Sequence, residues 1–298
     1  MFNPLVKEYR GRFGHGRTMA DILAWVEDLP PMPDVIRRAL QLVDDIKTIP
    51  EELARVIMLD PALASPILRC ANSVSLGQQR EIATLEEAVL VVGMGQIKTM
   101  LIASALRRWN GSFGPVQRLV WEKSLGAACG ARVLCEQLNK RYRDELNLTG
   151  LLHNLGQIVL LSHKDFGKVY PDVLKRIREC DEDFVTAERE IIGFSHPLIG
   201  ALVARKWDFP YSTCRAILHY AEPCKSIADE EDEKLAVLKL AAEIGLTLGF
   251  GRPPTYSLDP EELETLAGLV GLDPAQDDLK AVMSEIKTRF TSEVSAYS

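Results

Sequence analysis

The chain has 298 residues, of which 47% are hydrophobic and 26% are charged, and its formal net charge is −7. This composition is ordinary for a folded globular protein and allows one large domain or two smaller ones. The negative net charge argues against nonspecific nucleic-acid binding, because phosphate contacts need clustered Lys and Arg side chains.

The sequence predicts a cytoplasmic protein. Its N-terminus has no apolar run of the kind that a signal peptide needs. A membrane span needs about 20 uncharged apolar residues, and Gln96 and Lys98 interrupt the region that comes closest. The six cysteines form no Cys-x-x-Cys pair, which is typical of reduced thiols in a cytosolic protein.

Residues 1–18 come first in chain order and predict a flexible basic arm. They contain four basic residues, one acidic residue and three glycines: Lys7, Arg10, Arg12, Arg17, Glu8, Gly11, Gly14 and Gly16. Chain termini of this kind are poorly ordered unless something holds them in place.

From Met19 onward the pattern is helical. Residues 29–33 (LPPMP) end one helix and start another, because proline fits the first turn of a helix and not its interior. We find no alternating strands joined by hairpin turns, so the predicted fold class is all-α. Capping boxes or Asp-Pro starts mark further helices at Thr48–Glu51, Asp60–Pro61, Thr84–Glu87, Asp259–Pro260 and Asp273–Pro274.

Three segments that could suggest a ligand site are interpreted as structural. Val91–Thr99 lacks the glycine that a P-loop has directly before Lys-Thr, so we predict a turn between two packed helices. We interpret Asn72 as a buried amide that ties helices together. The acidic run Asp229–Glu233 predicts a solvated linker before the next helix.

Gly150–Ser162 is the most apolar continuous segment, and it contains the polar pair His153–Asn154. Burying a polar group without a hydrogen bond costs about 1–3 kcal/mol. The pair therefore needs hydrogen-bond partners, a metal ion or a solvent-lined pocket. His-Asp at the same place would be a metal-binding pair.

Several segments of the chain form a recognisable set of motifs. They are LPPMP at 29–33, DPALASPILRCANS and TLEEAV within 60–106, WEKSLGAACGARVL at 121–134, GLLHNLGQIVLL at 150–161, EREIIGFSHPLIGALVARKWDFP at 188–210 and AILHYAEP at 216–223. Together these segments resemble the HDOD family, the HD-related output domains of bacterial signalling proteins. The resemblance covers about residues 20–250 and implies an HD-domain-like multi-helix bundle with an N-terminal helical half.

The resemblance also sets the predicted domain organisation. After the arm at 1–18, an HDOD domain spans 19–250, with an N-terminal helical half at about 19–110 and an HD-like half at about 115–250. We expect a C-terminal helical extension at 251–298.

HD phosphohydrolases hold divalent metals with a His…His-Asp…Asp set, and the resemblance allows each position to be checked. Lys123 replaces the first histidine, and Asn154 replaces the aspartate of the central pair. The last aspartate falls near Ala242, with Glu243 beside it as a substitute.

Two further histidines, His196 and His219, match those of two-metal variants. The resemblance thus implies a vestigial HD-site pocket made of Lys123, His153, Asn154, His196, His219 and Glu243. We expect no catalytic residue, cofactor or metal there, because hard divalent ions prefer carboxylate oxygens and a lysine ammonium repels a cation. Lys123 and Glu243 are a candidate charge pair. The alternative is one divalent metal ion held by His153, His196 and His219.

The leading functional hypothesis is a non-enzymatic bacterial signalling and regulatory module without a membrane segment. It would bind a signalling protein partner or, alternatively, a small nucleotide. The second hypothesis is a metal-dependent phosphohydrolase acting on a phosphodiester or nucleotide. A third, minor hypothesis is nucleic-acid binding through the N-terminal Arg and Lys residues.

Overall fold

The computed structural model describes residues 2–9, 11, 13–73, 81–109, 114–180, 182–224, 226–252, 260–273 and 278–294. Within these ranges the regular elements are all helices, which confirms the all-α prediction. Contacts divide the chain into two compact units, one of Met1–Pro31 with Trp109–Met283 and one of Met32–Arg108 with Ser284–Ser298. The first 31 residues therefore group with Trp109–Met283 and not with the helices that directly follow them. The domain boundaries given above remain a prediction.

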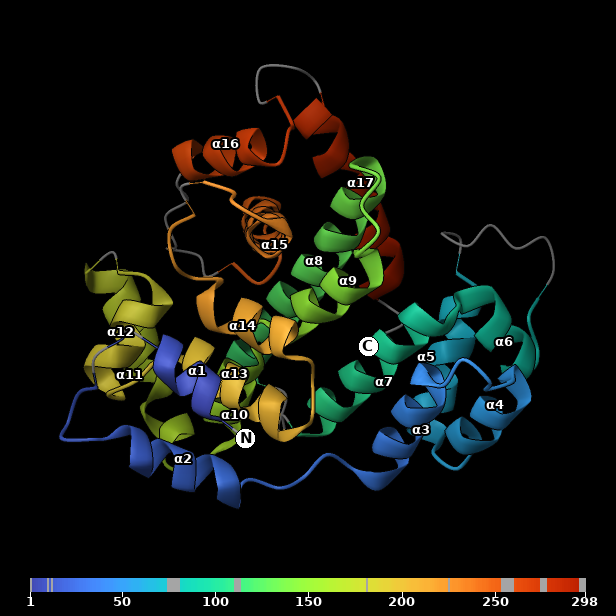
Figure 1. Cartoon of the computed structure of the whole chain (residues 1–298), viewed down its shortest axis with the longest axis horizontal. Coiled ribbons are helices and arrows are strands. Elements are labelled where there is room, and N and C mark those ends of the chain that lie inside the picture. Colours follow the sequence, from blue (N-terminus) through green and yellow to red (C-terminus); the bar gives the residue numbers. More distant parts are fainter. Residues whose placement is uncertain are drawn as a thin grey trace. The chain divides into compact units, whose positions relative to one another are not determined.

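The smaller unit is built mainly from consecutive helices (Figure 1). They are α3 (Asp34–Asp44), α4 (Pro50–Met58), α5 (Pro61–Ala71), α6 (Leu85–Val92), α7 (Met94–Trp109) and the end of α17 (Asp278–Glu293). Asp60 caps α5 by accepting a hydrogen bond from the Ala62 N–H at 3.1 Å, and Thr84 caps α6 through the Glu87 N–H at 3.2 Å. Both predicted starts are confirmed. The predicted Asp259 and Asp273–Pro274 signals lie wholly or partly outside the described residues.

The capping box predicted at Thr48 is wrong. Ile49 is the N-cap residue of α4, and no side chain caps this helix. Pro50 occupies the first helical position, where its fixed φ angle suits the start of a helix. The helix therefore begins one residue later than a Thr48 cap would require.

The segment around Gly93 is a turn between helices, as predicted. Gly93 has φ +81°, a conformation that glycine adopts without steric cost, and it separates α6 from α7. The two helices differ in direction by 111°. Among the described helices none alone is long and apolar enough to cross a membrane, although this bent pair has the combined length and composition of a span.

Asn72 joins the end of α5 to the segment before α6. Its amide nitrogen donates to the carbonyl oxygens of Leu68 and Ile82, both at 2.9 Å, and its oxygen accepts the Ile82 N–H at 2.8 Å. The structural role is as predicted. The predicted burial is wrong, since Asn72 is exposed, although Ala71 and Ile82 beside it are buried.

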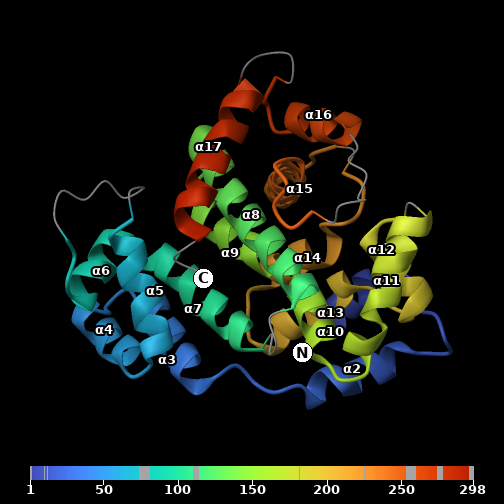
Figure 2. The same cartoon turned by 180° about the vertical axis from the view of Figure 1, so that it is seen from behind.

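The larger unit contains most of the remaining helices. They are α1 (Asn3–Glu8), α2 (Met19–Asp28), α8 (Pro115–Gln137), α9 (Arg143–Leu152), α10 (Leu155–Ser162), α11 (Phe166–Cys180), α12 (Phe184–Ile191), α13 (His196–Lys206), α14 (Tyr211–His219), α15 (Glu230–Thr247), α16 (Pro260–Leu269) and the start of α17. Helix α8 packs along α9 and α15, and α10 packs on α13 (Figure 2).

Glycine allows the closest helix contact in this core. A Cβ atom at Gly156 in α10 would lie 1.9 Å from the backbone oxygen of His196 at the start of α13. Only a residue without a side chain permits this approach. The contact brings the start of α13 next to the His153–Asn154 junction.

The N-terminal segment is attached to the larger unit at several points. Leu5 in α1 is buried, and the Gly14 N–H donates to the Gly193 oxygen at 2.8 Å. Lys206 in α13 donates to the backbone oxygens of Val26 and Glu27 at the end of α2, at 3.0 and 2.7 Å. A cation at a helix C-terminus also interacts favourably with the helix dipole. The segment predicted as an arm thus makes defined contacts.

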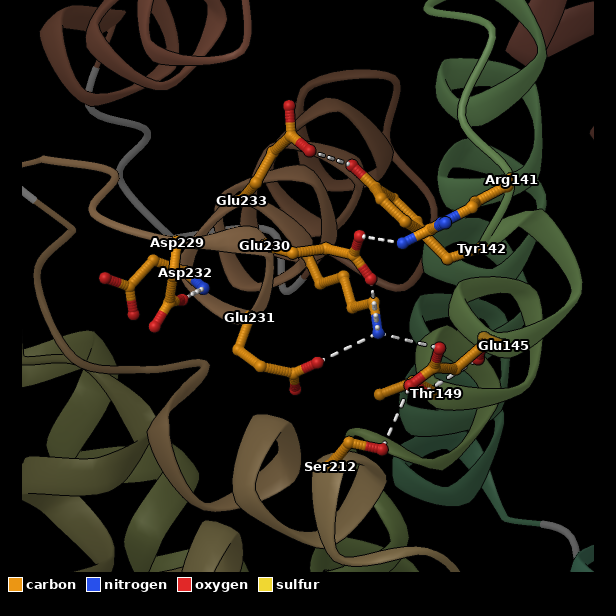
Figure 3. A network of polar contacts seen from close by, with 11 residues as sticks. Arg141, Tyr142, Glu145, Thr149, Ser212, Asp229, Glu230, Glu231, Asp232 and Glu233 are labelled. Atoms are coloured by element: carbon orange, nitrogen blue, oxygen red, sulfur yellow. Dashed lines mark hydrogen bonds and ion pairs between the residues drawn. The ribbon is translucent and has the colours of Figure 1, made fainter.

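The acidic run Asp229–Glu233 is not a linker but the N-cap and first turn of α15 (Figure 3). Asp229 caps the helix by accepting the Asp232 N–H at 2.9 Å, and Glu233 accepts the Tyr142 hydroxyl at 2.8 Å. Carboxylates are stabilised at the positive end of a helix dipole. The prediction of a solvated linker was wrong because the run supplies both the cap and this dipole interaction.

Candidate functional site

His153 and Asn154 lie where α9 ends and α10 begins, and both are fully buried. His153 Nδ1 is 2.6 Å from the Gly150 carbonyl oxygen. A carbonyl can only accept, so Nδ1 carries the proton and Nε2 presents a lone pair. That Nε2 atom is buried and has no hydrogen-bond partner in the described part of the chain.

Asn154 is held by side chains from two other segments. Its amide nitrogen faces the Ser124 hydroxyl of α8 at 3.5 Å, and its oxygen accepts the Tyr220 hydroxyl at 3.2 Å. Ser124 in turn donates to the Val120 oxygen at 2.9 Å. The Asn154 amide is therefore part of a hydrogen-bond chain.

Both ring nitrogens of His196 are hydrogen-bonded. Nδ1 lies 2.7 Å from Glu188 Oε2, and Nε2 bonds to the Tyr220 hydroxyl. Tyr170 donates to the other Glu188 oxygen at 2.7 Å. A continuous buried chain thus links Tyr170, Glu188, His196, Tyr220, Asn154 and Ser124.

Burial sets the protonation of these groups. It lowers the pKa of His196, although the Glu188 carboxylate opposes this effect. Burial and the Lys123 charge hold the pKa of His153 well below its usual value, so this imidazole is neutral near pH 7. Burial and the Glu188 carboxylate raise the pKa of Tyr170, which therefore remains a hydrogen-bond donor.

Lys123 in α8 places an ammonium group beside this chain. The side chain is 8% exposed, and Nζ lies 5.1 Å from the centre of the Phe184 ring and 5.9 Å from that of Tyr220. Among the residues that the structure describes, none forms a hydrogen bond or an ion pair with the Lys123 ammonium group. Burial lowers its pKa to about 8, against the attraction of the Glu243, Glu188 and Asp183 carboxylates. The half-buried Glu243 thus acts on Lys123 by charge and not as a close ion pair.

His219 belongs to a different cluster from His153 and His196. Its Nε2 atom lies 3.2 Å from Glu8 Oε2 in α1, and Nδ1 lies 3.1 Å from Glu222 Oε2. Lys123, His153, Asn154 and His196 are thus gathered around Tyr220, whereas the bonds of His219 lead to α1. In the described ranges no three or more His, Cys, Asp or Glu side chains are arranged to hold a metal.

Sequence reasoning did not identify Tyr170, Glu188 or Ser124 as members of the site. The available signal was the EREIIG segment directly before FSHPL, which places Glu188 eight residues before His196. Nothing in that spacing distinguishes a buried glutamate from an exposed one on α12.

The fold and this pocket define the class: an all-α domain with a buried pocket whose polar residues form one hydrogen-bond chain. The family model described as the HDOD domain matches residues 29–223. The chain belongs to the HDOD family, as its sequence motifs predicted.

Other proteins share the fold at low sequence identity. A structure from Geobacter sulfurreducens, named as an HDOD domain protein with unknown function, is 21% identical with a TM-score of 0.70 and covers 94% of this chain and 98% of its own. A Shewanella amazonensis protein named as a candidate phosphohydrolase is 22% identical with a TM-score of 0.70, over 93% and 97% of the two chains. A Marinobacter aquaeolei protein named as a candidate signal transduction protein is 20% identical with a TM-score of 0.68, over 99% and 64%.

An uncharacterized protein of Treponema pallidum is 22% identical over 289 residues, which are 93% of this chain and 52% of the relative. The chain therefore spans about half the length of this curated relative.

Proposed function

We propose that this chain is a bacterial signalling and regulatory module that binds a protein partner, and that its HD-type pocket is a structural core rather than a catalytic metal centre. Membership of the HDOD family supports the regulatory role. The similarity to a protein named for signal transduction is consistent with it. The bacterial sources of the similar proteins support a bacterial setting.

The observation that carries this proposal is the full engagement of His196. Its two ring nitrogens bond Glu188 and Tyr220, so neither is free to bind a metal. His219 is bonded by Glu8 and Glu222. Only Nε2 of His153 keeps a free lone pair among these three histidines.

The charge of the pocket supports the same conclusion. Mg²⁺ and Mn²⁺ need several oxygen ligands, preferably carboxylates, whereas Asn154 offers one neutral oxygen that already accepts the Tyr220 hydroxyl. The Lys123 ammonium adds a positive charge that repels a cation. The residues present do not fit a divalent metal ion.

Metal content and phosphodiester turnover test the proposal directly. The purified chain is expected to carry less than one equivalent of Mn or Fe by elemental analysis. We also expect no hydrolysis of bis(p-nitrophenyl) phosphate with added Mn²⁺. The double variant Lys123→His with Asn154→Asp restores an imidazole and a carboxylate, so its Mn²⁺ binding in calorimetry should exceed that of the unchanged chain.

The competing function is a metal-dependent phosphohydrolase, and the free lone pair of His153 Nε2 is the observation that favours it. It would require stoichiometric metal in the unchanged chain and turnover that His153→Ala abolishes. His163→Ala, which alters a histidine at the end of α10 outside the pocket, is the matched control. That combination of results would overturn the proposal.

A further inference from the structure

Helix α1 lies on one face of α14, and Glu8 is the residue that fastens it. Glu8 accepts a hydrogen bond from the Tyr211 hydroxyl, and its Oε2 atom is 3.2 Å from His219 Nε2 and 3.8 Å from Arg215 Nε. These three partners are spaced four residues apart, so they line one stripe of α14. We call Tyr211, Arg215 and His219 the α14 stripe.

The α14 stripe is suited to a carboxylate. A phenol, a guanidinium and an imidazole all point donors at one acidic group. Burial raises the pKa of Glu8, but the hydrogen bonds from Tyr211 and His219 outweigh it and hold the pKa below its usual value. A neutral amide at the same place would accept fewer hydrogen bonds and carry no charge for Arg215.

The stripe has two further acidic neighbours. Arg215 is 3.8 Å from Asp232 in the first turn of α15, and His219 is 3.1 Å from Glu222. These carboxylates belong to the larger unit itself and orient the Arg215 and His219 side chains. The donor groups of the α14 stripe are thus held in place facing α1, even though Tyr211 is 37% exposed.

Helix α1 is short, and its form depends on a small number of contacts. It has only six residues, and an isolated helix of that length is not stable in water. Leu5 at 1% exposure and Phe2 at 8% supply its buried apolar side chains. The Glu8 side chain itself remains 35% exposed. The helical form of α1 therefore depends on its contact with the larger unit.

We propose that α1 is a detachable internal ligand of the α14 stripe, and that the stripe is an interaction site for an acidic helical segment of a partner protein. The chemistry of that segment is given by α1: a carboxylate one turn after a buried leucine. The partner would displace α1 and place its own carboxylate between Tyr211 and His219. This inference rests on the proposed partner-binding function and names the surface that performs it.

Amide hydrogen exchange in the full chain tests whether the Glu8 contacts hold α1 on the α14 stripe. Glu8→Gln is expected to speed amide exchange in residues 3–9 by about tenfold, the effect of losing one charge-assisted hydrogen bond. Glu179→Gln alters an exposed glutamate of α11 and should leave these amides unchanged. Circular dichroism should show the same helix content for both variants. Unchanged exchange in Glu8→Gln would contradict the inference.

A peptide supplied in trans tests the interaction site itself. The probe is a fluorescent peptide with the sequence of residues 2–9, FNPLVKEY, measured by anisotropy. An attached segment competes at an effective concentration on the order of millimolar, so the peptide should bind the Glu8→Gln chain more tightly than the unchanged chain. A peptide with Gln in place of Glu8 should bind both chains about tenfold more weakly.

Equal binding of the two peptides, or no binding to the Glu8→Gln chain, would overturn the inference. Neither result would bear on the metal-free pocket, because Glu8 is not part of it. Conversely, stoichiometric metal together with phosphodiester turnover would refute the proposal that the pocket is a structural core. It would not change the interpretation of the peptide-binding result. The two proposals can therefore fail separately.

Discussion

A single oxygen of Glu188 binds His196 twice. Oε2 accepts the backbone N–H of His196 at 2.7 Å and lies 2.7 Å from Nδ1 of the same residue. The Glu188 carboxylate thus accepts a backbone N–H from the first turn of α13 and also fixes the orientation of the His196 imidazole. Because the other oxygen accepts the Tyr170 hydroxyl, α11, α12 and α13 meet at this group.

Removing the Glu188 carboxylate should lower the free energy of unfolding by more than removing any exposed carboxylate does. Glu188→Ala leaves the buried donors of His196 and Tyr170 without their partner, and each unsatisfied buried donor costs about 1–3 kcal/mol. Glu188→Gln should cost less, because the amide keeps the volume and one acceptor oxygen. Urea unfolding measures both. Glu179→Ala is the control, with a change expected within about 0.5 kcal/mol, and an equally small effect of Glu188→Ala would contradict the prediction.

Lys123 should destabilise the folded chain below pH 8. Burial lowers its pKa from 10.5 to about 8. The folded state therefore holds this proton less tightly than the unfolded state, and stability rises as the pH increases from 8 to 10.5. At pH 7 the full penalty applies. Lys123→Met keeps most of the volume and should raise the free energy of unfolding by about 1–3 kcal/mol.

The pH dependence separates this effect from a packing effect. The gain from Lys123→Met should shrink when urea unfolding is repeated at pH 10, since the lysine of the unchanged chain is then neutral. Lys175→Met, an exposed position of α11, should change stability little at either pH. A loss of stability in Lys123→Met at pH 7 would mean that attraction by Glu243 and Glu188 outweighs burial.

Local patterns allowed the fold to be predicted, because each depends on neighbouring residues alone. Asp60 and Thr84 cap helices as predicted, and Gly93 supplies the turn between α6 and α7. The HDOD motifs indicated which residues gather near the apolar segment, and Lys123, His153, Asn154 and His196 do surround Tyr220.

The contacts of the site could not be predicted from local patterns. Glu188 has the same polar character as any exposed residue of α12, and only the fold brings Tyr170 and His196 to it. His219 is bonded by Glu8, 211 residues earlier in the chain. No motif or periodicity indicates a contact over that separation.

The α10–α13 contact should not tolerate a side chain. In Gly156→Ala the new Cβ atom would lie 1.9 Å from the His196 backbone oxygen, so the helices must move apart. Overpacking of this kind costs about 1–3 kcal/mol or more. Gly268→Ala is the matched control in α16, where nothing lies within 4 Å, and it should stabilise the chain by about 0.5–1 kcal/mol. Thermal unfolding of the two variants should therefore shift in opposite directions, and a shared direction would contradict the packing argument.

Lys234 should respond to the same substitution as Lys123 in the opposite sense. Its Nζ atom lies 3.0 Å from Glu145 and 2.9 Å from Glu231, and its side chain is 11% exposed. Burial lowers its pKa, but the bonds to Glu231 and Glu145 outweigh it and raise the pKa above the usual value. The folded state therefore binds this proton more tightly, and the contribution to stability is present below pH 10.5.

Lys234→Met would leave these carboxylates, with Glu230 at 3.5 Å from the lost ammonium, to repel one another. We expect a loss of about 1–3 kcal/mol at pH 7 in urea unfolding. The loss should be smaller at high salt, because repulsion between partly exposed charges is screened. Lys175→Met again serves as the control. Lys123 and Lys234 differ in whether carboxylates contact the ammonium group. A gain of stability in Lys234→Met would therefore show that burial and not pairing decides both cases.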